Sequence, residues 1–184
     1  MSPQYEKMVK YHQEGVHLVV ATVRQIPPQC LDPKIKHMNR MCNDLADLEA
    51  KRIDSQAEAL MLDINGFAAE CPRKGFFMVK EGRLLTSKAA NRLGSITQGV
   101  IIELAKELKI EFAEEDLSPY DLYNADEIFL AGTSFVIYPV AKFNGRVLEK
   151  PIPGEITKRL FSAFSKKVGC DVSQRAKNYV QAKA

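Results

Sequence analysis

The chain has 184 residues, 46% of them hydrophobic and 27% charged, and its net charge is +3. A domain of this size buries about 70% of the surface that its unfolded chain exposes, so it can form a core without disulfides or a structural metal. The composition excludes intrinsic disorder and collagen-like structure. A weak charge of mixed sign does not support nucleic-acid binding, which needs a concentrated basic face.

Basic residues concentrate only toward the C-terminus. Residues 155–184 contain seven Lys and Arg, the last of them Lys183, against Glu155 and Asp171. Solvated helix faces and chain tails commonly carry such charge. We therefore interpret residues 169–184 as a basic tail and predict no nucleic-acid partner.

The cysteines and apolar runs indicate a cytoplasmic protein. The spacing of the cysteines contains no C-x-x-C pair, and no histidine stands at ligand spacing from a cysteine or another histidine, so we expect free thiols in a reducing compartment and no metal site. The cysteines are Cys30, Cys42, Cys71 and Cys170. The apolar run 16–23 is far shorter than the ~20 residues of a membrane span, and the N-terminus does not resemble a signal peptide.

The first predicted elements are a strand and a helix. Residues 16–25 are apolar and β-branched, a pattern typical of a buried strand, and Pro27-Pro28 ends it. Asp32-Pro33 predicts a helix start, because Asp is a favoured N-cap and Pro suits the first helical position. The apolar residues that follow at helical spacing predict a stripe that faces the core. They are Ile35, Met38, Met41, Leu45 and Leu48.

Two antiparallel hairpins are predicted next. Asn65-Gly66 is a strong two-residue turn signal because both positions tolerate a positive φ. Glu81-Gly82 marks a second turn. The paired strands are 58–64 with 67–71, and 75–80 with 83–85.

The last third of the chain predicts three helices and two strands. Ser95 to Gln98 has the form of a capping box, and Ser118-Pro119 begins a short helix. The strands are 127–130 and 135–140, and the last helix is 154–168. The inward residues are Val100, Ile101, Leu104 and Leu108 on the helix after Ser95, and Ile156, Leu160, Phe164 and Val168 on the last one. The whole pattern predicts an α+β, or mixed α/β, fold with antiparallel-rich strands and flanking helices.

Three features of different kinds could carry chemistry. Lys36 lies in the first turn of the predicted helix, beside its apolar stripe, and Glu70 ends a strand of small and apolar residues. The helix start at 94–97 and the loop Gly132-Thr133 offer amides and hydroxyls to a phosphate. Each feature alone is more often a solvated lysine, a surface carboxylate or an ordinary cap. Together they match pyridoxal phosphate, which needs a lysine, a partner for its ring nitrogen and an anion site.

Four segments resemble the fold-type IV, or class IV, aminotransferases, a family that includes branched-chain and D-amino-acid aminotransferases and aminodeoxychorismate lyase. The segments are 32–40, 65–70, 93–97, and 125–127 followed by 132–134. The resemblance implies a transaminase acting on an amino donor and a 2-oxo acid acceptor, and a homodimer at full length. It places Lys36 on the Schiff-base lysine and Glu70 on the glutamate that binds the pyridine nitrogen. It assigns Ile96, Thr97 and Thr133 to the phosphate, and the amides of Ser134 and Phe135 to the substrate carboxylate.

The resemblance covers residues 15–168, which we interpret as a pyridoxal-phosphate domain between a lead-in of residues 1–14 and the basic tail. The family has an N-terminal domain that supplies an arginine to the phosphate, and nothing here resembles it, so we expect the cofactor domain alone. The run Cys71 to Phe77 also departs from the family pattern. Two alternatives stay open: a lyase of the aminodeoxychorismate type, and a catalytically silent fragment or interaction module.

Overall fold

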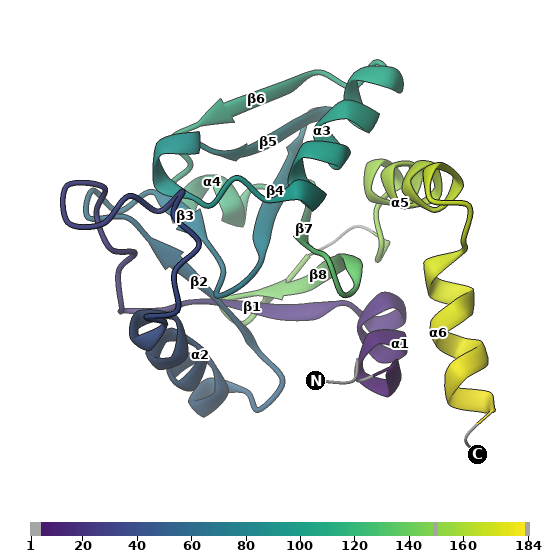
Figure 1. Cartoon of the computed structure of the whole chain (residues 1–184), viewed down its shortest axis with the longest axis horizontal. Coiled ribbons are helices and arrows are strands. Elements are labelled where there is room, and N and C mark those ends of the chain that lie inside the picture. The colour runs from purple at the N-terminus through teal and green to yellow at the C-terminus, as the bar shows by residue number, and fades with distance from the viewer. Residues whose placement is uncertain (1–4, 149–150, 183–184) are drawn as a thin grey trace.

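In the residues that the computed structural model describes, 5–148 and 151–182, nine strands form one mixed sheet with helices around it (Figure 1). The sheet order is β3-β2-β1-β8-β7-β4-β5-β6, with β9 paired to β8. The pairs β1–β2, β1–β8 and β5–β6 are parallel and the others antiparallel. This arrangement confirms the mixed α/β fold class. The strands are β1 Val16–Val20, β2 Glu58–Leu62, β3 Ala68–Glu70, β4 Gly75–Lys80, β5 Arg83–Ser87, β6 Phe112–Glu115, β7 Glu127–Gly132, β8 Val136–Phe143 and β9 Arg146–Val147.

The helices cover both faces of the sheet (Figure 1). They are α1 Tyr5–Glu14, α2 Met41–Ile53, α3 Ile96–Glu107, α4 Pro119–Tyr123, α5 Glu155–Lys167 and α6 Val172–Gln181, with a short 3₁₀ helix at Ala89–Asn91. Alternate residues of the central strands face opposite sides, as the two-residue period of a strand requires. Phe77 and Phe129, whose ring centroids are 5.1 Å apart, pack under α3 and α5, whereas Phe76 belongs to the core on the other face.

The strand pairing of both predicted hairpins is confirmed, but the first turn is longer than the predicted two residues, since β2 ends at Leu62 and β3 begins at Ala68. β2 pairs with β3, and the turn between them is held by Asp63, whose carboxylate accepts the amides of Asn65 and Phe67, each at 2.9 Å. β4 pairs with β5, and both turn residues, Glu81 and Gly82, have positive φ, as a tight hairpin turn requires.

The predicted helix start at Asp32-Pro33 is wrong. Residues 31–40 form a loop, in which the Asp32 carboxylate accepts the Lys34 amide at 3.0 Å and closes a local turn. Helix α2 begins only at Met41. Asp and Pro favour turns as well as helix starts, and here the turn prevailed.

The apolar stripe predicted for this helix does not face the core. Its members Ile35, Met38, Met41, Leu45 and Leu48 are all 46% to 85% exposed. Helix α2 packs on β1 and β2 through Ala46 and Ala50, which are fully buried. Small residues let a helix approach a sheet closely, so the alanines rather than the larger side chains make the contact.

Other boundaries also differ from the predictions. The first strand ends at Val20 instead of Gln25, and Ser95 precedes α3 without a hydrogen bond from its side chain to the helix. β6 was not predicted. Val168 is half exposed, so it does not face inward at the end of α5.

The two terminal segments pack together. Residues 172–181 of the expected tail form α6, which lies beside α1 (Figure 1). The rings of Tyr5 and Tyr179 are 4.0 Å apart at their centroids. Residues 1–4 of the lead-in and Lys183 and Ala184 of the tail lie outside the described residues. Among the helices that the structure describes, none is long and apolar enough to cross a membrane.

A buried carboxylate fixes the start of α5. Glu127, at the start of β7, accepts the amides of Ile156 at 3.0 Å and Thr157 at 2.9 Å, and the Thr157 hydroxyl at 2.6 Å. The amides have no acceptor within the helix, so the carboxylate supplies it. Gly154 lies directly against Glu127, and a Cβ there would be 2.1 Å from the carboxyl carbon.

Candidate active site

A cavity of about 400 Å³ gathers most of the residues predicted to carry chemistry. The loop before α2 lines it together with the ends of β3 and β7, the start of β4 and the turn into α3. Of the predicted site residues, Lys36, Glu70, Ile96 and Thr133 line this cavity. Thr97, Ser134 and Phe135 are not among the lining residues.

Lys36 reaches the cavity from a loop instead of from a helical turn. The loop is anchored by Pro33, which is buried, and by the turn at Asp32. Lys36 itself is exposed, and within the described residues its ammonium group forms no ion pair with a carboxylate. Its amine is therefore available to a ligand in the cavity.

Glu70 lies at the end of β3, with its carboxyl group held at both oxygens. Oε1 accepts a hydrogen bond from the Gln25 side chain at 3.2 Å, and Oε2 accepts one from the Leu93 amide at 3.2 Å. Burial raises the pKa of the Glu70 carboxyl to about 7. The hydrogen bond from Leu93 and the positive charge of Arg92 act in the opposite direction on this pKa. The group is therefore poised to gain or lose a proton near neutral pH.

The simplest structural role for Glu70 would be an ion pair with Arg73 or Lys74, which follow it in the sequence. The structure excludes this for Arg73. Its guanidinium binds Asp47 at 2.8 Å and also Asp44, both on α2. These contacts tie the loop between β3 and β4 to α2.

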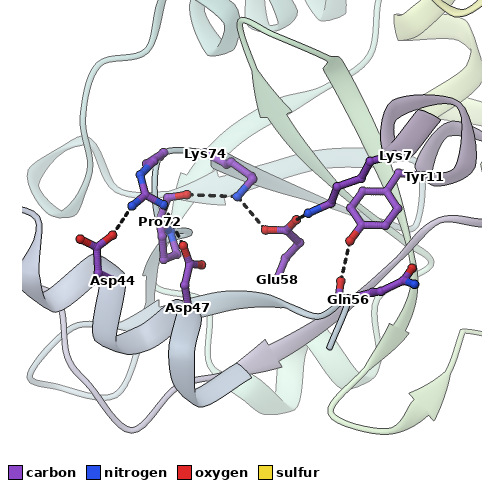
Figure 2. Close-up of polar contacts among 9 residues, drawn as sticks. Lys7, Tyr11, Asp44, Asp47, Gln56, Glu58, Pro72 and Lys74 are labelled. Carbon is purple, nitrogen blue, oxygen red and sulfur yellow. Dashed lines mark hydrogen bonds and ion pairs between the residues drawn. The ribbon is translucent and has the colours of Figure 1, made fainter. Parts of the chain in front are cut away.

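Lys74 also forms its ion pair with a carboxylate other than Glu70. Its ammonium group lies 2.7 Å from Oε2 of Glu58 and 3.3 Å from the Pro72 carbonyl oxygen. Figure 2 shows Glu58 between Lys74 on one side and Lys7 on the other. Lys7 lies 3.3 Å from Oε1 of the same carboxylate, which is buried. Neither Arg73 nor Lys74 therefore pairs with Glu70. Glu70 is the carboxyl group among the described residues that line the cavity.

The N-terminus of α3 faces the cavity. Ile96 occupies the first helical position with its side chain 86% exposed, and the first amides of any helix lack acceptors within it. Thr97 is buried beside it. Thr133 is exposed in the turn between β7 and β8 and lines the same cavity. Amides at a helix start favour an anion, because they combine free N–H groups with the positive end of the helix dipole.

The turn after Thr133 holds the residues predicted for the substrate carboxylate. Ser134 is exposed, whereas Phe135 is buried and its ring stacks on Tyr138 at 3.9 Å between centroids. The Phe135 amide donates to the Gly132 carbonyl at 3.4 Å, and its own carbonyl accepts a hydrogen bond from His12 at 3.0 Å. The carboxylate role of Ser134 and Phe135 stays a prediction.

Two polar atoms at this cavity lack partners. Within the described part of the chain, Nδ1 of His37 and Nε2 of Gln98 are buried without a hydrogen bond. The Arg92 guanidinium lies 3.5 Å from Oε1 of Gln98, which orients the amide. Gly75 leaves room for it, since a Cβ there would be 2.2 Å from Gln98.

Sequence reasoning missed several residues of this site. They are Gln25, His37, Arg40, Arg92 and Gln98. The sequence predicts only a strand end at Gln25 and a capping box at Gln98. The polar character of these residues was visible, but only the tertiary fold brings them to Glu70 and Lys36.

The chain matches a known protein family over most of its length. The family model described as "Amino-transferase class IV" matches residues 2–143. The chain belongs to the class IV aminotransferases. The family resemblance inferred from the four sequence segments is thereby confirmed.

Individual class IV relatives are similar over the same region. A protein of Methanocaldococcus jannaschii named after the branched-chain-amino-acid aminotransferases is 39% identical over 153 residues, which are 83% of this chain and 53% of that protein. The branched-chain-amino-acid aminotransferase of Escherichia coli K12 is 36% identical over 154 residues, 83% of this chain and 50% of the enzyme. The chain therefore spans about half the length of these curated relatives.

Solved structures agree with this family assignment. The branched-chain amino acid aminotransferase from Escherichia coli superimposes with a TM-score of 0.78 at 35% identity, covering 82% of this chain and 52% of that one. The T.th. branched-chain amino acid aminotransferase complexed with N-(5'-phosphopyridoxyl)-L-glutamate gives a TM-score of 0.80 at 28% identity and covers 89% of this chain and 53% of that one.

Proposed function

We propose that the chain is the cofactor domain of a pyridoxal-phosphate-dependent transaminase. One observation carries this proposal: the amine of Lys36, the carboxyl of Glu70 and the N-terminus of α3 line the same cavity. These are the three kinds of group that pyridoxal phosphate requires. The unpartnered Nδ1 of His37 and Nε2 of Gln98 further support a site whose polar groups are completed by a ligand.

Each residue has a distinct role in this proposal. When bound, the cofactor supplies an electron sink for the charge left at the substrate α-carbon. Lys36 would hold the cofactor covalently through Nζ. Once the amino substrate has displaced it, the same nitrogen would carry the proton from the substrate α-carbon to the cofactor. Glu70 keeps a negative charge beside the ring nitrogen and so holds the proton there. A carboxyl group with a pKa of about 7 is easily ionised by such a cationic partner.

The N-terminus of α3 and the turn at Thr133 suit the phosphate. The amides of Ile96 and Thr97 and the hydroxyls of Thr97 and Thr133 are the donors we assign to it. We assign the amides of Ser134 and Phe135 to the carboxylate of the substrate. The hydrogen bond from the Phe135 amide to the Gly132 carbonyl oxygen is long, at 3.4 Å. The amide would therefore exchange this acceptor for a stronger one.

The substrates we propose are an amino acid donor and a 2-oxo acid acceptor, in keeping with the branched-chain aminotransferases that the chain resembles. At full length we propose a homodimer. The four cysteines are free thiols, which supports a cytoplasmic location.

A single set of assays separates the proposal from its alternatives. The purified chain is incubated with pyridoxal phosphate and then with L-leucine or L-glutamate, and release of the 2-oxo acid is measured. A transaminase yields the corresponding 2-oxo acid and needs an acceptor to continue. An aminodeoxychorismate-type lyase instead releases pyruvate from its substrate without an acceptor. A silent module stays colourless and cannot be reconstituted with the cofactor, and that result would refute the proposal.

A further inference from the structure

Among the described residues that line the cavity, Arg40 is a cation that has neither a carboxylate partner nor a role in the proposed function. Arg40 is the residue directly before α2, four positions after Lys36, and it lines the same cavity as Lys36 and Glu70. Its side chain is half-buried. Its backbone is fixed, because its carbonyl oxygen accepts the amide of Asp44 at 2.9 Å in the first turn of the helix. Arg40 therefore lines the cavity from a fixed position of the backbone.

The other cationic side chains near Arg40 are neutralised by the protein. Arg73 binds Asp44 and Asp47. Lys74 binds the buried Glu58 (Figure 2). Arg40 differs from both. Within the described residues it forms no ion pair and no side-chain hydrogen bond, although Asp44 is only one helical turn away. The nearby carboxylates thus pair with Arg73 and Lys74 and leave Arg40 to the cavity.

The balance of charge in the cavity favours an anion. Lys36 and Arg40 line it without carboxylate partners, and Glu70 is the carboxylate among its lining residues. The oxygens of Glu70 are already engaged by Gln25 and Leu93. A half-buried guanidinium has lost part of its hydration shell. A ligand that supplies hydrogen-bond acceptors in place of the lost water therefore stabilises it. Its planar fork matches carboxylate and phosphate oxygens two at a time.

We propose that Arg40 is an anion-recognition residue of this cavity, which binds a carboxylate or phosphate of the ligand through two parallel N–H···O bonds. The choice of ligand rests on the proposed function. That function offers two sources of the anion: the phosphate of the cofactor, and the second carboxylate of a dicarboxylic amino acid or 2-oxo acid.

The first experiment needs no cofactor. Inorganic phosphate, glutarate and butyrate are titrated into the cofactor-free chain by NMR, for the wild type, Arg40→Gln, Arg40→Lys and Arg52→Gln. Arg52 is the matched control, because it is exposed in the last turn of the same helix and does not line the cavity. We expect Arg40→Gln to weaken the binding of phosphate, glutarate or both by about tenfold, the effect of losing a charge-assisted pair. Arg40→Lys keeps the positive charge but lacks the planar guanidinium, so we expect a smaller loss of affinity. We expect Arg52→Gln to bind both anions as tightly as the wild type does.

The second experiment identifies the source of the anion. Pyridoxal phosphate and pyridoxal are titrated into the same four proteins, followed by 2-oxoglutarate and 4-methylvalerate on the loaded chains. If Arg40 holds the phosphate, Arg40→Gln weakens pyridoxal phosphate binding about tenfold and leaves pyridoxal binding unchanged. If it holds a substrate carboxylate, cofactor affinity is unchanged and only the binding of 2-oxoglutarate weakens.

The proposal is overturned if Arg40→Gln binds phosphate and glutarate as tightly as Arg52→Gln does, or if the wild type binds neither. A matching circular dichroism spectrum for each variant shows that its fold is intact. Failure of the chain to bind pyridoxal phosphate would overturn the proposed function alone, because the phosphate and glutarate comparison does not use the cofactor.

Discussion

The Leu93 amide donates a hydrogen bond of 3.2 Å to Oε2 of Glu70, and this bond joins the end of β3 to the turn that leads into α3. It connects two of the segments that line the cavity. Glu70 is the group we assign to the ring nitrogen, and Ile96, three residues after Leu93, begins the helix assigned to the phosphate. The distance between these two binding groups is therefore set by a short, hydrogen-bonded piece of chain, which suits a rigid ligand with a ring at one end and a phosphate at the other.

Replacing the charge of Glu70 is expected to abolish most of the activity without abolishing cofactor binding. Gln at this position has nearly the same size and can still accept from Leu93, but a neutral amide cannot hold a proton on the ring nitrogen. We expect Glu70→Gln to lower the rate of the half-reaction with an amino acid by about a hundredfold or more. The measurement is a single-turnover assay of 2-oxo acid release.

The matched control for this variant is Glu111→Gln. Glu111 is an exposed glutamate that pairs with Arg83 at 2.8 Å, outside the cavity. It should retain the wild-type rate. A Glu70→Gln variant as fast as this control would show that Glu70 is only structural.

The raised pKa of Glu70 makes the stability of the cofactor-free chain depend on pH. The folded protein binds this proton up to a pH of about 7, whereas the unfolded chain releases it near 4.5. The contribution to stability is therefore fully present below pH 4.5 and is lost as the pH rises through 7. It amounts to at most about 3 kcal/mol.

Glu70→Gln removes this titration, so the comparison of the two proteins isolates it. From urea denaturation at pH 4.5 and pH 8, we expect the wild type to lose stability relative to the variant over this interval. A constant difference between the two proteins at both pH values would mean that burial does not hold Glu70 in its neutral form.

The start of α5 should be sensitive to a single methyl group. Gly154→Ala would place a Cβ 2.1 Å from the carboxyl carbon of Glu127, so Glu127 must leave its position at the helix start. The amides of Ile156 and Thr157 then lose their acceptor inside the protein. We expect the free energy of unfolding to fall by about 2 kcal/mol, as measured by urea denaturation.

Gly99→Ala is the control for that variant. Gly99 lies on the exposed side of α3 with open space where a Cβ would stand. Alanine is favoured over glycine in a helix by about 1 kcal/mol, so this change should stabilise the protein slightly. Equal effects of the two substitutions would contradict the role assigned to Glu127.

Local signals predicted the parts of this fold that are held by local interactions. The turns of the two hairpins use a positive φ at Gly66 and at Glu81-Gly82. The short helix α4 follows Ser118, whose side chain caps it together with Asp121. The first residues of α2 could not be predicted in the same way. Asp32-Pro33 fits both a turn and a helix start, and only the sheet determines that the alanines of α2 face inward.

The sequence also predicted the candidate site only in part. Motif resemblance identified Lys36 and Glu70, which the structure places at one cavity. It did not identify Gln25, which reaches Glu70 across 45 positions of sequence. Nor did it indicate Arg40, since an arginine becomes notable only when its neighbours Arg73 and Lys74 are seen to be paired elsewhere.

Substitution of Lys36 should remove covalent attachment of the cofactor and leave the fold unchanged. Lys36 is an exposed loop residue, so Lys36→Ala creates no cavity in the core. Its circular dichroism spectrum should match that of the wild type. Lys34→Ala is the matched control, because Lys34 lies two residues away, is exposed and does not line the cavity.

The most direct test of the account is to locate the attachment site. The chain is incubated with pyridoxal phosphate, reduced with borohydride and digested, and the peptides are analysed by mass spectrometry. The account predicts a phosphopyridoxyl group on Lys36 in the wild type and in Lys34→Ala, and none in Lys36→Ala. A label on Lys34 or Lys74, or a wild-type chain that takes up no label, would contradict it.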